Sequence, residues 1–324
     1  MNLYKYIRHF LTDYSFQDLT VGEIELSSIN RCWKISHVEG CWLLKQCNND
    51  YTDDWLALVN KLIPELKRYG LENLLECSEL GYFIGGDGVY WTLSKYLENA
   101  TSPSLNCAET VQKATTYLKN MQAINISNYS DYLSLEIGRN DLRTVLQNGQ
   151  NLIHFYSSLD DEYFIRSSVY KCEFISALKN IDFAGTLAAY NSLDLFISHG
   201  EYQIQNILEY RGSWNPVDWD NLHLRSRIVD VLTTVAYFCR IERGGFKLNR
   251  SLVVSVIRSF NLNQKELNLL PSLSFLYFVP SPYLFDKFYR LNPSGLNWYL
   301  PWGIKAAYQL KCQLHQIINN YQNE

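Results

Sequence analysis

Residues 198–206 read Ser-His-Gly-Glu-Tyr-Gln-Ile-Gln-Asn, and residues 218–220 read Asp-Trp-Asp. An apolar run precedes the first stretch, and an Arg-Gly-Ser turn divides the interval between the two. This order predicts a strand, a loop, a β-hairpin and a second loop. Loops held by a rigid frame can bring polar side chains from the ends of short strands together. We therefore expect Glu201, Asn206 and Asp218 to contribute to one functional site.

The residue types in this pattern fit phosphoryl transfer. That reaction needs a group that positions and deprotonates the acceptor hydroxyl, hard oxygen ligands for Mg²⁺, and a cation on the nucleotide phosphates. Glu201 offers the carboxylate, Asn206 and Asp218 offer oxygen ligands, and Lys45 upstream offers the cation. Simpler interpretations stay open, because Asx side chains also favour turns and a strand lysine is often only solvated.

The first third of the chain predicts a small antiparallel sheet. Bulky apolar and polar residues alternate over 33–38, Glu-Gly supplies a turn, and a second β-rich run covers 41–46. Two runs joined in this way are typical of a hairpin. The runs 82–84 and 89–93, joined by Gly-Gly-Asp-Gly, predict another hairpin.

A helix is predicted between these hairpins. Apolar residues recur at helical spacing from Trp55 to Leu66, after a polar stretch that can cap the helix. Pro64 should kink or divide this helix, and Gly70 should end it.

The pattern changes after residue 99. A polar, turn-rich segment at 100–104 is the best candidate boundary, which predicts domains at 1–99 and 100–324. Beyond it, helical periodicity prevails, and amphipathic or apolar helices are expected over residues 108–124, 133–146, 228–241 and 303–320. The fold class predicted is α+β, with a small β-rich N-lobe and a larger, mainly α-helical C-lobe.

Composition excludes several classes of function. The chain has 324 residues, 47% of them hydrophobic, and a formal net charge of -4, so it has a core but no polybasic surface for nucleic acid. No apolar run approaches the roughly 20 residues that span a bilayer, and no signal peptide is recognisable at the start. The eight cysteines form no Cys-x-x-Cys pair, so we expect reduced thiols, no zinc site and a cytoplasmic location.

The paired motifs 198–206 and 218–220 resemble the His-Gly-Asp-x-x-x-x-Asn and Ile-Asp-[Phe/Trp]-[Asp/Gly/Glu] motifs of the aminoglycoside phosphotransferase and choline-kinase-like superfamily. The Asp-x-Asp form of the second motif is similar to the spore-coat-kinase-like branch. The resemblance covers most of the chain and implies a protein-kinase-like bilobal fold. It also implies ATP, with GTP as an alternative, together with Mg²⁺ and an alcohol group as phosphoryl acceptor.

Site roles follow from the resemblance, position by position. Asn206 and Asp218 correspond to the metal ligands, with Asp220 as a lesser candidate, and His199 to the histidine that braces the catalytic loop. Lys45 is similar to the strand lysine that holds the nucleotide phosphates. Further positions implied are Glu65 as the helix partner of that lysine, Glu98 in the hinge beside the nucleotide, and Arg227 and Asp230 as a structural pair.

Glu201 departs from the motif, which has an aspartate there. The carboxylate is retained, but its oxygens move by about one C–C bond, and an error near 1 Å can cost on the order of a hundredfold in positional catalysis. The loop near 27–30, expected to cover the nucleotide, also lacks a glycine cluster.

Two functions are therefore consistent with the sequence. One is an ATP- and Mg²⁺-dependent phosphotransferase whose acceptor is an aminoglycoside-like molecule, another small metabolite or a peptide. The other is a nucleotide-binding pseudokinase that acts as a scaffold or regulatory partner of another protein. The acidic run 160–162 could favour a cationic acceptor, although a solvated turn is the more common explanation of such a run.

Overall fold

A computed structural model describes residues 3–11, 15–24, 30–47, 53–68, 83–84, 89–132 and 141–323. The chain divides into two compact units. The N-terminal unit comprises Met1–Pro103, Ile124–Leu135 and Gln205–His223, and the C-terminal unit comprises Ser104–Ala123, Glu136–Ile204 and Leu224–Glu324. The domain bounds 1–99 and 100–324 stay a prediction.

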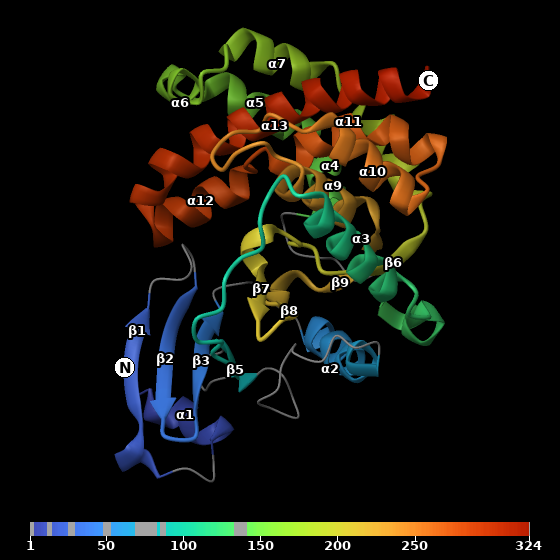
Figure 1. Ribbon diagram of the computed structural model, residues 1–324. Coiled ribbons are helices and arrows are strands. Elements are labelled where there is room, and N and C mark those ends of the chain that lie inside the picture. The colour runs from blue at the N-terminus through green and yellow to red at the C-terminus, as the bar shows by residue number, and fades with distance from the viewer. Residues whose placement is uncertain are drawn as a thin grey trace. The chain divides into compact units, whose positions relative to one another are not determined.

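The N-terminal unit contains a five-stranded antiparallel sheet in the order β1-β2-β3-β5-β4 (Figure 1). Both predicted hairpins are confirmed, since β2 pairs with β3 and β4 pairs with β5. The glycine-rich link of the second hairpin, 85–88, lies outside the described residues. The strands are β1 (Thr20–Ile24), β2 (Arg31–His37), β3 (Gly40–Cys47), β4 (Phe83–Ile84) and β5 (Tyr90–Lys95).

Helix α1 (Tyr4–Phe10) completes the core of this sheet. The Tyr6 ring stacks on Trp91 of β5 with centroids 4.0 Å apart, and Trp91 stacks on Trp33 of β2 at 5.5 Å. Ile7 is fully buried in the same cluster. Burial of these large side chains gives the small sheet a core of its own.

Helix α2 (Asp53–Arg68) is not divided at Pro64, so that part of the prediction is wrong. Pro64 lies on the exposed side of the helix, where water can satisfy the backbone carbonyl that loses its amide partner. Buried residues such as Leu58 and Leu62 lie on the other face and favour an uninterrupted helix. The predicted end at Gly70 lies outside the described residues.

A second hairpin in the N-terminal unit carries the later motif. Strands β7 (Ile207–Tyr210) and β8 (Ser213–Pro216) pair antiparallel, as the sequence predicts. A further bridge joins Thr101 to Glu209. Short 3₁₀ segments of this unit are η1 (Phe16–Asp18), η2 (Ile126–Tyr132) and η4 (Trp219–Asn221).

The C-terminal unit is mainly helical, which confirms the predicted fold class (Figure 1). Strand β6 (Leu195–Ser198) pairs with β9 (His223–Ser226), which begins at the border between the units. The helices are α3 (Ala108–Gln122), α4 (Leu142–Gln147), α5 (Gly149–Ser158), α6 (Asp161–Ser167), α7 (Lys171–Lys179), α8 (Phe183–Asn191), α9 (Ile228–Phe238), α10 (Arg250–Phe260), α11 (Gln264–Phe278), α12 (Pro282–Leu291) and α13 (Pro293–Gln322).

The last helix is longer than its periodicity predicts. α13 begins ten residues before the expected start at 303, with Pro293 in its first turn and the Asn292 side chain accepting from the Gly295 amide. It continues through Pro301, which is buried. Of the predicted helix 133–146, residues 133–140 lie outside the described residues, and α4 occupies the remainder.

Within the described parts of the chain, no helix combines the length and the apolar character needed to cross a membrane.

The core position of Ile7 makes a stability prediction. Ile7→Ala removes a fully buried side chain and should lower the free energy of unfolding of the N-terminal unit by about 2–5 kcal/mol. Lys5→Ala, at an exposed position of the same helix, should change it by less than about 0.5 kcal/mol. Urea denaturation followed by tryptophan fluorescence measures both, and equal effects of the two variants would contradict this packing.

Candidate functional site

In the N-terminal unit, the candidate site is centred on Lys45. It sits in the middle of the sheet, on β3, opposite Cys32 of β2 and Thr92 of β5. Its Nζ lies 2.8 Å from Asp218 Oδ1 and 2.6 Å from Asp220 Oδ1, and only 12% of its side chain is exposed. An ammonium that is largely removed from water is strongly held between two carboxylates, because the ion pairs compensate for the hydration that it loses.

The loop that carries these carboxylates is fixed by backbone geometry. Asp218 has φ of 64°, in the left-handed region that few non-glycine residues adopt. The Val217 amide donates to the Asn206 carbonyl at 2.8 Å, which joins the ends of the β7–β8 hairpin. The Trp219 indole donates to Pro216, and Trp55 of α2 donates to the Leu222 carbonyl at 3.0 Å. The strained Asp218 backbone is thus held by bonds on both sides.

Asp220 has a larger role than the sequence indicated. Its side chain is almost fully buried, and its second oxygen accepts a 3.1 Å hydrogen bond from Asn30, just before β2. Asp218, by contrast, keeps 36% of its side chain exposed. Asp220 therefore fixes Lys45, while Asp218 retains an accessible oxygen. Asn30 was missed because a lone asparagine before a strand is more often a turn residue.

The donor set fits Mg²⁺. Mg²⁺ in nucleotide sites is bound by one or two carboxylates, and phosphates and water complete its octahedron. Asn206 and Asp218 offer hard oxygen atoms at the two ends of one hairpin, as their predicted roles require. No group of three or more His, Cys, Asp and Glu side chains suited to a metal occurs among the described residues. The substrate phosphates would therefore have to provide the remaining ligands.

The loop of residues 199–203, which carries Glu201 and which we call the acid loop, lies in the C-terminal unit. Both backbone polar groups of its Gly200 are hydrogen-bonded. Gly200, with φ of 79°, donates its amide to Asp230 Oδ1 at 3.2 Å. Its carbonyl accepts a 2.6 Å hydrogen bond from the Tyr277 hydroxyl of α11. The Gln203 amide then turns back to the Glu201 carbonyl at 2.8 Å. The backbone that carries Glu201 is therefore positioned by residues from α9 and α11, and Tyr277 is a contact that sequence motifs did not indicate.

Two buried groups support this loop. Burial raises the pKa of Asp230 to about 6, although the amides of Gly200 and His199, the Ser198 hydroxyl and the Arg225 charge favour its ionised form. His199 is fully buried and meets the Tyr202 ring edge-to-face at 5.8 Å. This position is consistent with the bracing role predicted for His199 and the structural role predicted for Asp230.

Other predicted site residues have different partners. Glu65 forms an ion pair with Arg68 on its own helix, at 2.6 Å, and no pair with Lys45 occurs among the described ion pairs. Lys45 is occupied by the two aspartates instead. Glu98 is exposed and contacts Lys34, whose hydrogen bond lowers the pKa of the Glu98 carboxyl. Arg227 forms a two-pronged pair with Glu266, at 2.7 and 2.8 Å. In the nucleotide-covering loop, residues 27–29 lie outside the described residues.

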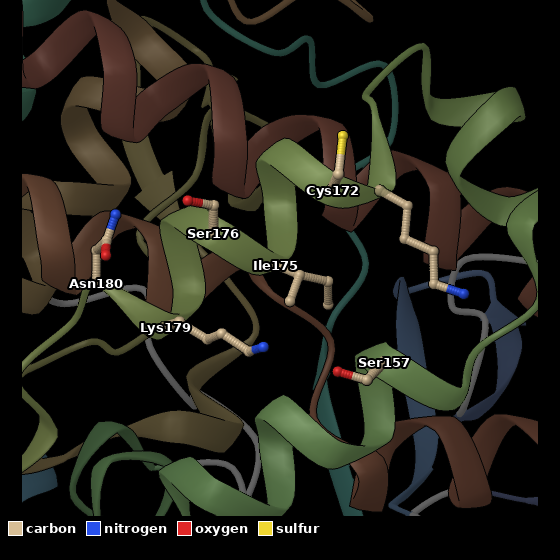
Figure 2. Close-up of a pocket in the computed structure, with 7 residues that line it drawn as sticks. Ser157, Cys172, Ile175, Ser176, Lys179 and Asn180 are labelled. Carbon is tan, nitrogen blue, oxygen red and sulfur yellow. The ribbon is translucent and has the colours of Figure 1, made fainter.

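A separate hollow of about 670 Å³ lies on α5 and α7, away from these motifs in the sequence (Figure 2). Its lining includes Ser157, Lys171 and Lys179. Lys171 is already bound to Asp161 and to the Leu159 carbonyl. None of the predicted site residues lines this hollow.

Comparison with solved structures identifies proteins of the same fold. Aminoglycoside 2'-phosphotransferase-IIIa, solved with GDP, superposes with a TM-score of 0.62 at 10% identity over 97% of this chain and 99% of its own. Spectinomycin phosphotransferase, solved with ADP and spectinomycin, gives 0.59 at 13% identity over 97% and 98%. Choline kinase from Cryptosporidium parvum gives 0.52 at 10% identity over 98% and 97%.

These similarities confirm the predicted resemblance at the level of the fold, which is the protein-kinase-like fold of phosphotransferases that act on small molecules. Sequence comparison finds no matching protein-family model and no matching curated protein. The spore-coat-kinase-like branch stays a prediction.

The raised pKa of Asp230 makes a pH prediction. The folded pKa of about 6 exceeds the ordinary aspartate value of 3.8, so between these two pH values the folded state holds a proton that the unfolded state releases. The associated stability is complete below the lower value and is lost as pH rises through the higher one. Asp230→Asn cannot titrate, so from about pH 4 to pH 8 the wild type should lose roughly 2–3 kcal/mol relative to this variant. Urea titrations at several pH values measure the difference, and parallel pH profiles would contradict the assignment.

Proposed function

We propose that the protein is an ATP- and Mg²⁺-dependent phosphotransferase that acts on a hydroxyl group of a small molecule. The observation that carries the proposal is Lys45 held between Asp218 and Asp220, at 2.8 and 2.6 Å. Nucleotide phosphates are bound by a lysine together with a metal ion that a carboxylate holds, and Lys45 and the accessible Asp218 offer these two groups. The fold similarity to phosphotransferases solved with ADP or GDP supports the same conclusion.

The N-terminal unit would bind the nucleotide. Lys45 would contact the phosphates, while Asp220 and Asn30 keep its side chain in place. Asn206 and Asp218 would hold Mg²⁺, which neutralises charge on the phosphates when it is bound. GTP could serve in place of ATP. Glu98, which the resemblance places in the hinge, would lie beside the nucleotide base. Glu65 would have to exchange Arg68 for Lys45 to fill its predicted role.

Glu201 would position the acceptor and receive its proton. The acceptor oxygen forms a bond to the γ-phosphorus, the bond between that phosphorus and the bridging oxygen of ADP breaks, and the hydroxyl proton passes to the Glu201 carboxylate. Four residues lie between Glu201 and Asn206, so the five Cα–Cα steps of the chain keep their Cα atoms within about 18 Å. The fixed Gly200 peptide limits the freedom that the longer glutamate side chain adds.

A pseudokinase is the second candidate, and the glutamate at position 201 is the observation that favours it. A binding protein of this kind would retain nucleotide affinity without turnover and would act through a protein partner. The seven described cysteines are all free thiols, which supports a reducing, cytoplasmic location for either function. Neither function calls for nucleic acid or a membrane as partner.

Nucleotide binding can be tested through Lys45. Mg-ATP at about 100 times its Kd should add about 2.7 kcal/mol of stability, a rise in Tm of about 5 °C. Lys45→Met should abolish most of that rise, since the phosphates lose their cation. Lys113→Met, at an exposed position of α3 where the lysine pairs with Glu109, should retain it. A thermal-shift assay with Mg-ATP and Mg-GTP makes the comparison, and the absence of any rise in the wild type would contradict nucleotide binding.

Turnover can be tested through Glu201. Glu201→Gln removes the proton acceptor and should reduce phosphate transfer about a hundredfold or more. Glu201→Asp shortens the side chain and should also reduce it, by up to about a hundredfold, in an enzyme built around glutamate. The assay measures ADP release and labelled phosphate transfer to a library of small alcohols, with the nucleotide thermal shift as the control for binding. Higher activity of Glu201→Asp, or no activity in any form, would favour the pseudokinase.

A further inference from the structure

A connected group of aromatic side chains lies in the C-terminal unit. The helices that carry these side chains lie next to each other (Figure 1). α11 contacts α9 and α13, and α12 contacts α13. Ring contacts run through the group, with centroids 5.0 Å apart for Tyr277–Phe278, 5.7 Å for Tyr237–Phe278, 6.4 Å for Phe278–Trp302 and 6.0 Å for Tyr299–Trp302. Phe288 stacks on Tyr299 at 4.5 Å.

Four members of this group are only partly buried as whole residues: Tyr237, Tyr277, Tyr299 and Trp302. We call these four residues the aromatic wall. Two more members, Phe278 and Phe288, are buried and contact the rings of Tyr237 and Tyr299. Such buried neighbours fix the orientation of the rings that they contact.

The aromatic wall adjoins the acid loop. The Tyr277 hydroxyl donates to the carbonyl of Gly200, the residue immediately before Glu201, at 2.6 Å. Burial raises the pKa of the Tyr237, Tyr277 and Tyr299 phenols, and the Glu201 charge raises all three further. All three phenols therefore remain uncharged at neutral pH.

The helices that carry the aromatic wall contain few acidic side chains that could bind a polycation. α13 contains no Asp or Glu, and α9, α11 and α12 contain one acidic residue each. Each of these three is already engaged: Asp230 accepts the Gly200 amide, Glu266 holds Arg227, and Asp286 pairs with Arg290 at 3.0 Å. A polyamine would need several acidic partners to replace the water around its charges.

A cation already occupies the aromatic faces at one edge of this group. The Arg240 guanidinium lies 5.2 Å from the Tyr237 centroid and 5.6 Å from that of Phe246, and Arg240 is 3% exposed. Cation–π attraction at Tyr237 is therefore satisfied from within the protein. A second cation placed nearby would be repelled by this buried charge.

From these contacts we infer that the phosphoryl acceptor is an uncharged alcohol with a ring, which packs on the aromatic wall and presents its hydroxyl to Glu201. The inference rests on the proposed function and specifies its acceptor. Ring faces stack on tyrosine and tryptophan without needing charge. In contrast to a site for a polycationic aminoglycoside, the acidic side chains of these four helices already have partners within the protein.

Equilibrium binding to the full protein, saturated with Mg-ADP, tests this acceptor class. The probes are a set of uncharged ring alcohols, with phenyl glucoside, inositol and thymidine among them, and the polycations kanamycin and neamine. Isothermal titration should detect at least one uncharged probe, with an affinity about tenfold or more above either polycation. Tyr299→Leu should weaken that affinity roughly tenfold by removing a stacking face, while Tyr299→Phe should stay within about threefold.

Tyr308→Phe provides a matched control on the same helix, because its hydroxyl contacts Glu173 and it does not belong to the aromatic wall. It should leave the affinity for the uncharged probe unchanged. Tighter binding of a polycation, failure of every uncharged ring alcohol, or an equal affinity in Tyr299→Leu would overturn the inference while Mg-ADP binding persists. Loss of Mg-ADP binding itself would instead count against the proposed function.

Discussion

The ion pairs of Lys45 with Asp218 and Asp220 are the interaction on which the rest of the N-terminal unit depends. They join the middle of the sheet to a loop more than 170 residues later in the chain. With only 12% of the lysine side chain exposed, the loss of either partner would leave a poorly hydrated charge. The two aspartates divide the work, because buried Asp220 fixes the lysine while half-exposed Asp218 remains accessible. Such a division allows a binding site to keep its shape and still exchange ligands.

In the C-terminal unit, the feature that matters most is the position of one carboxylate, that of Glu201. A glutamate at position 201 has one more rotatable bond than an aspartate, which costs positional accuracy. Bonds to both sides of the Gly200 peptide reduce that cost, since Asp230 and Tyr277 fix the point from which the side chain starts. Tyr277 also belongs to the aromatic wall, so one residue connects the backbone of the acid loop to the surface that we assign to the acceptor. The position of Glu201 and the selectivity for the acceptor would then depend on the same packed helices.

Local patterns in the sequence were enough to predict the parts of the fold that local chemistry decides. The hairpins β2–β3 and β7–β8 follow from alternation and turn residues, and α3 and α9 follow from apolar periodicity. The prediction that Pro64 divides α2 was wrong because the effect of a proline depends on the helix face that it occupies. The packing of the helix determines that face, and a local sequence pattern does not show it. The early start of α13 was missed because the prolines near its beginning are ordinary stop signals unless the first turn is capped, as it is by Asn292.

The candidate site shows the same limit. The sequence motifs and the family resemblance predicted Lys45, Asn206 and Asp218, and the structure brings Lys45 and Asp218 into contact. Asn30 and Tyr277 could not be found in this way, because each acts through one long-range hydrogen bond that leaves no local pattern. Glu65 was assigned by resemblance, but a nearby arginine on the same helix holds it in this structure.

The central claim is that the lysine and aspartates form a site for a nucleotide with its metal. Isothermal titration of ADP, with and without Mg²⁺, into the wild type and Asp218→Asn tests it most directly. The account predicts that Mg²⁺ raises the ADP affinity of the wild type about tenfold or more, and that the Asn variant loses most of this gain. ADP affinity that is absent, or that responds equally to Mg²⁺ in both proteins, would contradict the claim.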